Sequence, residues 1–288
     1  YQILANAVMI IWTLAIILPF ILLFMSSITD ENTLVANGYS FFPKKFSLAS
    51  YSYIIKSGGQ ILKAYGVSIG VTVVGTLLNV LLSALMAYPL SVKNLPGRNV
   101  MMFFVFFTML FNGGIVPSYI MWTGTFHIKD TIFAQLLPNF LLSAWNVMMI
   151  RTYFTTSIPD GLYEAAEIDG ASQFTIFWKI VLPLGKPILV TMGTFAGLAY
   201  WNDWTNGLYY IVKNTGLYNV QNLLNQMVQN IQFLTQSSNS NVTAAASTIP
   251  ATGIQMAIAF VAILPIMLIF PSFQKYYAKG IALGAVKG

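Results

Sequence analysis

The stretch EAAEIDGASQFTIFWKIVLP, Glu164 to Pro183, contains three of the eight acidic residues of a 288-residue chain. The chain around it is strongly apolar: 57% of its residues are hydrophobic and 8% are charged, against about 25% charged in ordinary soluble domains. Carboxylates are costly to place against lipid, so this segment is expected to face water or another protein. The composition predicts an all-α, polytopic membrane protein with a polar segment at one membrane face.

The net charge of +6 is spread thinly along the chain rather than concentrated in runs. Anionic lipid headgroups and the positive-inside rule explain such a charge, so membrane lipid and not nucleic acid is the expected partner. The chain has no cysteine, which excludes a disulfide framework, a thiol nucleophile and a cysteine metal site.

Six apolar runs are long enough to cross a membrane, which takes about 20 residues of helix. We expect six transmembrane helices in one domain over 1–288, at about 3–25, 66–92, 99–122, 131–150, 187–210 and 253–273. Lysine and arginine are slightly more frequent on the side of the two termini, which favours termini in the cytoplasm. The loop 152–186 is then cytoplasmic, and the loop 211–252 lies outside.

The cytoplasmic loop predicts a short helix, a sharp turn and a second helix. Ser157 is placed to cap the first helix, and Pro159 suits its first turn. Gly170 is suited to the left-handed position after that helix. Ser172 can cap the second helix, which Pro183 is expected to end. An amphipathic connector at the membrane surface, without any partner, would show the same pattern.

The spacing of a few residues in this loop carries a resemblance. Glu164-Ala165-Ala166 is followed after three residues by Gly170, and after nine more by Ile180-Val181-Leu182-Pro183. This spacing resembles the EAA motif of ABC importer permeases at every fixed position. WNDW, Trp201 to Trp204, and the C-terminal KGIALGAVKG are similar to the carbohydrate branch, the family of the smaller maltose-transporter permease. NGGIVPSY, Asn112 to Tyr119, resembles a subgroup that handles larger or complex oligosaccharides.

The resemblance implies a type I ABC importer permease fold with six transmembrane helices and a cytoplasmic coupling helix at about Pro159 to Asp169. That helix would dock into a separate ATPase through Glu164, Ala165, Ala166, Ile168, Asp169 and Gly170. The implied partners are a second homologous permease subunit in a heterodimer, two ATP-binding subunits, an extracytoplasmic solute-binding protein and an oligosaccharide. ATP and Mg²⁺ would be bound by the partner ATPase, and no cofactor by this chain. The implied location is the bacterial cytoplasmic (inner) membrane.

The implied function is ATP-driven import of oligosaccharides, among them uronate-containing ones derived from alginate or pectin. ATP-driven closure of the two ATPases would move the docked helices and switch the pore between inward- and outward-facing states. A non-sugar solute such as a peptide, carried by the same class of importer, stays open as an alternative.

Catalytic and metal chemistry find little support in the sequence. No G-x-x-x-x-G-K-[ST] motif occurs, so the chain has no P-loop for ATP. The chain has one histidine, His127, which excludes a multi-histidine metal site. Glu164 and Glu167 lie three apart on the expected cytoplasmic helix with no evident cleft, unlike a catalytic pair. We therefore expect a transport subunit, and neither an enzyme acting on lipid-linked sugars nor a scaffold.

Polar and aromatic residues inside the apolar runs mark a candidate path for substrate, because such residues are costly in lipid. The candidates are Asn79, Asn112, Asn146, Tyr200, Trp201, Asn202, Asp203 and Trp204. Indole rings with amide and carboxylate groups suit sugar hydroxyls and ring faces. The same residues could instead form an interfacial aromatic belt or bond neighbouring helices. In the maltose relative the other permease subunit holds the sugar.

Two further segments carry structural expectations. The outer loop places Val220, Leu223, Leu224, Met227, Val228 and Ile231 near helical spacing, which predicts a short amphipathic helix resting on the protein. The polar stretch TQSSNSNVTAAAST after it, Thr235 to Thr248, would then be free to reach outward. The C-terminal QKYYAKGIALGAVKG is polar and glycine-rich, so we expect it not to continue the sixth helix.

Overall fold

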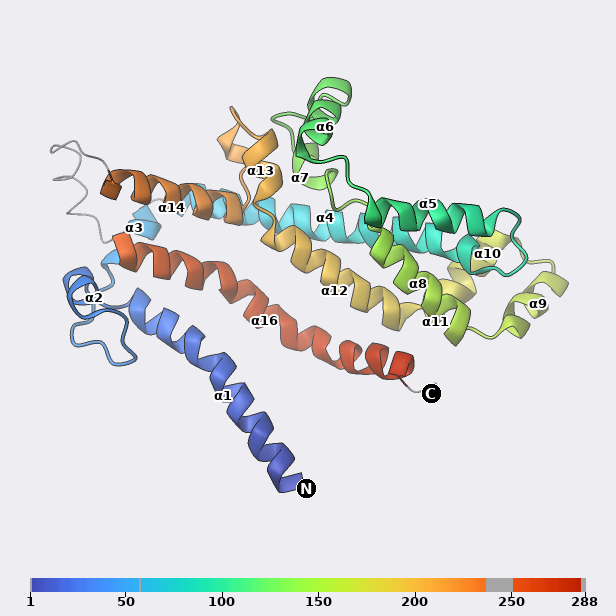
Figure 1. Ribbon diagram of the computed structural model, residues 1–288, viewed down its shortest axis with the longest axis horizontal. Helices are drawn as coiled ribbons and strands as arrows, with labels where there is room; N and C mark the ends of the chain where they lie inside the picture. The colour runs from blue at the N-terminus through green and yellow to red at the C-terminus, as the bar shows by residue number, and fades with distance from the viewer. Residues whose placement is uncertain (1, 57, 237–250, 286–288) are drawn as a thin grey trace. The chain divides into compact units, whose positions relative to one another are not determined.

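The computed structural model describes residues 2–56, 58–236 and 251–285 (Figure 1). Within these ranges the regular structure is helical, apart from one isolated antiparallel bridge between Thr29 and Phe46. The predicted all-α class is confirmed. The chain divides into two compact units: unit 1 comprises Tyr1–Tyr65 and Val220–Leu268, and unit 2 comprises Gly66–Asn219 and Ile269–Gly288.

Unit 1 is assembled from segments near the two ends of the chain. Its elements are α1 (Gln2–Ser27), α2 (Glu31–Asn37), α3 (Ala49–Lys56), the first turns of α4 (Gly58–Ser91), α14 (Val220–Gln236) and α16 (Ala251–Ala285) as far as Leu268. Val220, Leu223 and Leu224 of α14 pack with Ile54 of α3 and Ile254 of α16. The predicted amphipathic helix of the outer loop is therefore confirmed, since its residues Val220, Leu223, Leu224 and Met227 pack in this core.

The start of α16 is capped by a residue from the opposite end of the sequence. The Glu31 carboxylate accepts hydrogen bonds from the backbone N–H groups of Thr252 (2.9 Å) and Gly253 (2.8 Å). The first N–H groups of a helix have no partner inside it, and the helix dipole favours a negative charge there. Glu31 thus fixes the first turn of α16 from 221 residues away in the sequence.

Unit 2 contains the central part of the chain. Its elements are the rest of α4, α5 (Arg98–Leu110), α6 (Ile115–Ile120), the π-helical turn η1 (Met121–Thr125), α7 (Phe133–Leu136), α8 (Ala144–Ser157), α9 (Asp160–Ile168), α10 (Gln173–Ile176), the π-helical turn η2 (Phe177–Val181), α11 (Leu182–Leu184), α12 (Lys186–Asn202), α13 (Thr205–Tyr210), the 3₁₀ turn η3 (Thr215–Leu217) and the end of α16. Its largest core joins Ala87 of α4, Ile150 and Phe154 of α8, Phe177 of η2 and Ile188 of α12.

Helices α4 and α12 approach closely because glycines lie between them. A Cβ placed on Gly75 of α4 would stand 2.4 Å from the ring of Tyr200 on α12. On α12, a Cβ on Gly193 or Gly197 would stand 3.3 Å from side chains of α4. Small residues of this kind let membrane helices pack with their backbones near one another.

Some of the six expected spans correspond to single long helices, and others do not. In the described residues three helical stretches are long and apolar enough to cross a membrane: Gln2–Ser27, Gly58–Ser91 and Ala251–Ile269. Two bent pairs also qualify if each counts as one span, Arg98–Leu110 with Ile115–Thr125 and Gln173–Leu184 with Lys186–Asn202, bent by 110° and 78°.

The expected fourth span, 131–150, is not one continuous helix. It consists of the single turn α7, an irregular segment over 137–143, and α8, which begins at Ala144. Pro138 has no N–H to donate, and Asn139 adopts a left-handed φ of +67°, which ends right-handed helix. The expectation of a single helix was wrong.

The expectation for the C-terminal tail was also wrong. Helix α16 continues through Ala285 without a break. Lysine, alanine, leucine and isoleucine are acceptable helix formers, and each of the two glycines in this stretch costs only about 1 kcal/mol relative to alanine. The polar stretch 235–248 was expected to reach outward, and its residues from 237 on lie outside the described residues.

Candidate docking site

The first turn of α9 is fixed by a neighbouring loop. Helix α8 continues through Ser157, so this residue does not cap α9 as expected; the N-cap position belongs to Pro159, in extended conformation. Asp160 opens the helix, where a carboxylate complements the dipole. Its side chain pairs with Lys93, which follows the end of α4. The correction has a local reason, because Ile158 and Pro159 are both extended and stop α8 just after Ser157.

The end of α9 has the geometry predicted for its glycine. Gly170 adopts φ +76°. The N–H of Ala171 donates to the carbonyl of Ala166 (2.9 Å), and the N–H of Gly170 donates to that of Glu167 (3.0 Å). This pair of bonds is the Schellman motif, which satisfies the last carbonyls of a helix and turns the chain sharply.

Helix α9 has one buried and one exposed face. Ala166 is 8% exposed and packs in the core of unit 2, beside Tyr163. Ile168 is 86% exposed. The other residues expected to contact an ATPase, which are Glu164, Ala165, Asp169 and Gly170, are exposed as well. Of the expected docking residues, Ala166 alone faces the protein's own core.

A relay of side chains ties α9 to α4. The Gln173 amide donates to the Glu167 carboxylate (2.8 Å), and its oxygen accepts from the Tyr88 hydroxyl (2.5 Å). Tyr88 also lies near the ring of Tyr163. Burial, and next the nearby Tyr88, raise the pKa of the Tyr163 hydroxyl to about 12, so it stays neutral at physiological pH.

Sequence reasoning missed Lys93, Tyr88 and Gln173. Lys93 and Tyr88 lie 67 and 85 residues from their partners Asp160 and Gln173, so no local pattern points to them. Spacing within one element reports on short-range contacts only.

The second helix of the loop begins as expected and ends differently. The Ser172 hydroxyl accepts from the N–H of Thr175 (3.2 Å), which confirms it as the cap. Pro183 lies inside the helical run, which continues to Leu184, and so does not end it. Proline cannot donate to the carbonyl four residues earlier, and here the wider π-helical turn η2 directly precedes α11. Gly185 follows, where a Cβ would stand 2.6 Å from the ring of Phe154.

Most candidates for the substrate path are buried inside unit 2. The Asn79 amide donates to the carbonyl of Phe140 (2.6 Å), and its oxygen accepts from Asn146 (2.7 Å). The Tyr200 hydroxyl donates to the carbonyl of Leu136 (2.9 Å). These side chains satisfy carbonyls in and beside the irregular segment 137–143, as backbone at membrane depth requires.

Asp203 is likewise engaged in hydrogen bonds with the protein's own backbone. Its Oδ1 accepts from the N–H groups of Thr205 (3.0 Å) and Asn206 (3.2 Å), and so holds the start of α13. Trp201, two residues earlier in the sequence, is also buried. The exposed candidates for the path are Asn112, Asn202 and Trp204.

The described residues contain no group of three or more His, Cys, Asp or Glu side chains that could hold a metal ion. What the geometry defines is an all-helical membrane protein with a short helix that presents one face outward while its other face is anchored to the core.

Comparison with known proteins identifies the family. Residues 66–283 match the model of the "Binding-protein-dependent transport system inner membrane component" family, and the chain belongs to this family. It is 36% identical over 272 residues to Protein LplC of Bacillus subtilis (strain 168), covering 94% of this chain and 90% of that one. It is 36% identical over 288 residues to the polygalacturonan/rhamnogalacturonan transport system permease protein YtcP of the same organism, covering 100% and 98%.

A solved structure is similar over nearly the whole chain. It is described as a crystal structure of a bacterial ABC transporter involved in the import of the acidic polysaccharide alginate. The TM-score is 0.79 at 26% identity, covering 96% of each chain. The predicted permease fold is confirmed, and the protein is an inner membrane transport component.

Proposed function

We propose that this chain is one of two homologous permease subunits of an ATP-driven importer that takes oligosaccharides from an extracytoplasmic binding protein. Two separate ATP-binding subunits hydrolyse ATP with Mg²⁺, and this chain binds neither. The observation that carries the proposal is the exposed face of α9, which presents Glu164, Ala165, Ile168 and Asp169. The opposite face is anchored, because Ala166 packs in the core and side-chain bonds join α9 to the end of α4 and the turn after it.

The anchoring supports coupling between α9 and the membrane helices. Lys93 holds the first turn of α9, and Tyr88 holds its last turn through Gln173. Tyr88 lies in the last turn of α4, and Lys93 lies in the turn that follows it. When the ATPase moves α9, this end of α4 moves with it. Because α4 also carries Asn79, which bonds the irregular segment 137–143, the displacement reaches the middle of the fold.

The names of the relatives support a saccharide as the solute. YtcP is named for polygalacturonan and rhamnogalacturonan, and the similar solved structure for alginate. A uronate-containing oligosaccharide is therefore our first choice of substrate, ahead of the peptide alternative. Among the residues of the candidate path, Asn112, Asn202 and Trp204 are exposed enough to touch a passing sugar.

Docking can be tested by crosslinking, since the chain has no cysteine of its own. Ile168→Cys on the exposed face of α9 should crosslink to a cysteine in the ATPase of the assembled complex. Thr156→Cys, exposed on α8, is the matched control and should not. Equal crosslinking at both positions would remove the proposed role of α9.

Transport is tested separately in proteoliposomes with internal ATP and external binding protein. Labelled oligogalacturonides should accumulate inside, and unlabelled peptides should not compete. Accumulation of a peptide, with no uptake of any oligosaccharide offered, would contradict the choice of substrate but not the docking model.

A further inference from the structure

The segment after α2 exposes an unusual set of side chains. The sequence YSFFPKKFSL, Tyr39 to Leu48, combines aromatic residues with two adjacent lysines. Phe42 is 86% exposed, Phe46 67% and Leu48 68%. Exposed apolar side chains on this scale mark a surface that contacts something other than water.

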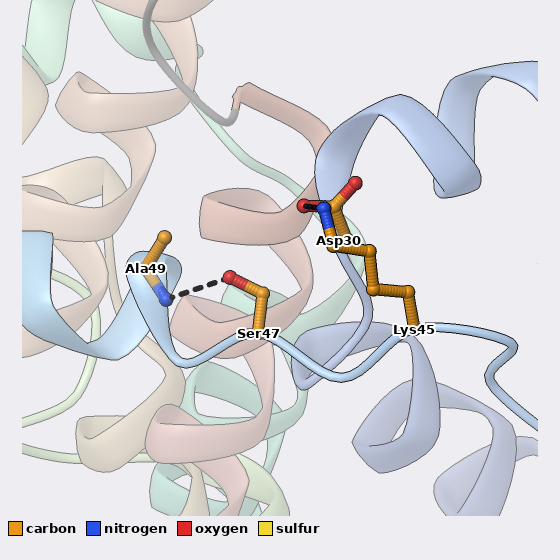
Figure 2. Close-up of polar contacts among 4 residues, drawn as sticks. All are labelled: Asp30, Lys45, Ser47 and Ala49. Atoms are coloured by element: carbon orange, nitrogen blue, oxygen red, sulfur yellow. Dashed lines mark hydrogen bonds and ion pairs between the residues drawn. The ribbon is translucent and has the colours of Figure 1, made fainter.

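The structure fixes this segment at the end of α1. The N–H of Asp30 donates to the carbonyl of Lys45 (3.0 Å), and the N–H of Ser47 donates to that of Ile28 (2.9 Å). The Lys45 ammonium also pairs with the Asp30 carboxylate at 3.3 Å. Figure 2 shows this pairing, with Ser47 accepting from the N–H of Ala49 at the start of α3. Phe46 therefore lies beside residues that follow directly on the last turn of α1.

The composition of α1 and the residues after it give the depth of that end. Its 26 residues extend about 39 Å at 1.5 Å per residue, whereas a hydrocarbon core is about 30 Å thick. Its most apolar window has no residue buried within the protein. The charged residues Asp30 and Glu31 follow closely on the end of α1, and charged side chains are costly in the hydrocarbon core. This end of α1 therefore lies among the lipid headgroups, and the segment paired to it lies at the same depth.

We propose that residues 39–48 form an interfacial anchor, with Tyr39, Phe42, Phe46 and Leu48 inserted at the headgroup boundary and Lys44 facing anionic lipid, next to the Lys45–Asp30 ion pair. Tyrosine gathers at membrane interfaces because its ring combines an apolar body with a polar hydroxyl. Phenylalanine and leucine form the apolar face of segments that lie in the interface. Lysines beside them are attracted to anionic headgroups. The leaflet is the one at the C-terminal end of α1, which is the outer leaflet if the termini are cytoplasmic.

Local structure prepares the segment for this role. Gly38 ends α2 with φ +72° and turns the chain. The Ser40 hydroxyl then accepts from the N–H of Phe42 (3.2 Å), which holds a tight turn with the Phe42 side chain outward. The anchor is thus a preformed loop, so little conformational entropy is lost on insertion.

The test uses single cysteines carrying a nitroxide in the assembled complex, in nanodiscs of neutral lipid or of lipid with an anionic fraction. The positions are Phe42→Cys, Leu14→Cys in the middle of α1 as the lipid reference, and Lys213→Cys, exposed in a polar turn, as the water reference. Accessibility to oxygen and to a water-soluble nickel complex is measured at each position. These two reagents separate lipid, water and protein contact.

We expect the oxygen-to-nickel ratio at position 42 to lie between those at Leu14 and Lys213, and several-fold above that at Lys213, as for a label at the headgroup boundary. The ratio should rise further with anionic lipid, and Lys44→Gln should abolish that rise. Equal ratios at 42 and 213 in both lipids would overturn the proposal. Low accessibility of position 42 to both reagents would also overturn it, because it indicates contact with protein. Shielding of position 42 that appears only when binding protein is added would overturn it as well. The depth is measured without substrate, so a negative result leaves the proposed transport function untouched.

Discussion

Gly170 occupies a backbone conformation that L-residues with a Cβ disfavour, at φ +76°. A Cβ there would meet no atom within 4 Å, so a substitution is penalised by the backbone alone, by about 1–2 kcal/mol. We predict that Gly170→Val loses most of the uptake and of the ATPase stimulation by loaded binding protein, at normal membrane insertion. Gly170→Asn should retain most of both, because asparagine tolerates this position. Equal activity of Val and Asn variants would mean that the turn is not needed for coupling.

The hydrogen bonds of the Asp130 carboxylate lead to a second prediction about a single residue. Its Oδ1 accepts from the N–H groups of Val212 (2.7 Å), Lys213 (2.7 Å) and Asn214 (3.2 Å). The hydrogen bond from Lys213 is the largest cause that lowers the pKa of this carboxyl below its usual 3.8. A lowered pKa stabilises the folded turn above pH 3.8, and that contribution is lost as the pH falls through the folded-state pKa.

Asp130→Asn should therefore mimic the acid form at neutral pH. We expect a nitroxide at Lys213→Cys to become more mobile in the Asp130→Asn background, and in the parent only at a pH below the folded-state pKa. Asp169→Asn, an exposed carboxylate on α9, is the control and should leave mobility unchanged. An unchanged label in Asp130→Asn would show that the three backbone bonds do not order this turn.

At this scale the sequence was informative wherever the cause was local. Gly170 and Ser172 could be predicted because a left-handed turn and a helix cap depend on neighbouring residues. Asn79 and Tyr200 were recognised as unusual, but their partners are backbone carbonyls of Phe140 and Leu136, which no side-chain pattern reveals.

The irregular segment 137–143 leads to a prediction about elements. Tyr200→Phe removes one hydroxyl and leaves the carbonyl of Leu136 without that donor. A buried group left unpaired costs about 1–3 kcal/mol. We expect a lower melting temperature in detergent for Tyr200→Phe. Tyr209→Phe, on an exposed side chain of α13, should leave it unchanged; equal effects would mean that the bond to Leu136 contributes little.

The close packing of α4 on α12 leads to a second prediction about elements. Gly75→Ala would press a methyl group into the Tyr200 ring, at 2.4 Å, and overpacking of this kind costs about 1–3 kcal/mol. Gly70→Ala, on the same helix with open space around it, should be neutral or stabilise by about 0.4–1 kcal/mol. Melting temperatures of the two variants provide the comparison. Similar changes in both would show that helix propensity, not contact with Tyr200, decides the result.

The presence of a helix was predictable where one apolar run forms one helix, although boundaries differ: α4 begins at Gly58, whereas the span was expected from about 66. The runs that became α1 and α4 did so. The run 131–150 did not, because apolar composition cannot distinguish a continuous helix from a broken one whose carbonyls are bonded by other helices. Pro138 was visible in the sequence, but proline occurs inside continuous membrane helices as well.

At the scale of the molecule, the Glu31 carboxylate joins the two ends of the sequence within unit 1. Loss of a helix cap costs about 0.5–2 kcal/mol. We predict faster hydrogen exchange at Thr252 and Gly253 and a lower melting temperature in Glu31→Ala. Glu31→Gln keeps an acceptor oxygen without the charge and should have a smaller effect. Exchange as slow in the alanine variant as in the parent would show that α16 needs no cap from α2.

Unit 1 is discontinuous in the sequence, since its two halves are separated by the whole of Gly66–Asn219. On the ribosome, α1, α2 and α3 are therefore made long before α14 and α16. The core partners of Ile54 on α3, which include Val220 and Ile254, do not yet exist at that stage. Chains arrested at increasing lengths should show protection of residues 28–56 from protease only after α16 has emerged. Until then the N-terminal part of unit 1, up to Tyr65, is without these partners. We therefore expect the insertion machinery, rather than the fold, to protect its helices during synthesis.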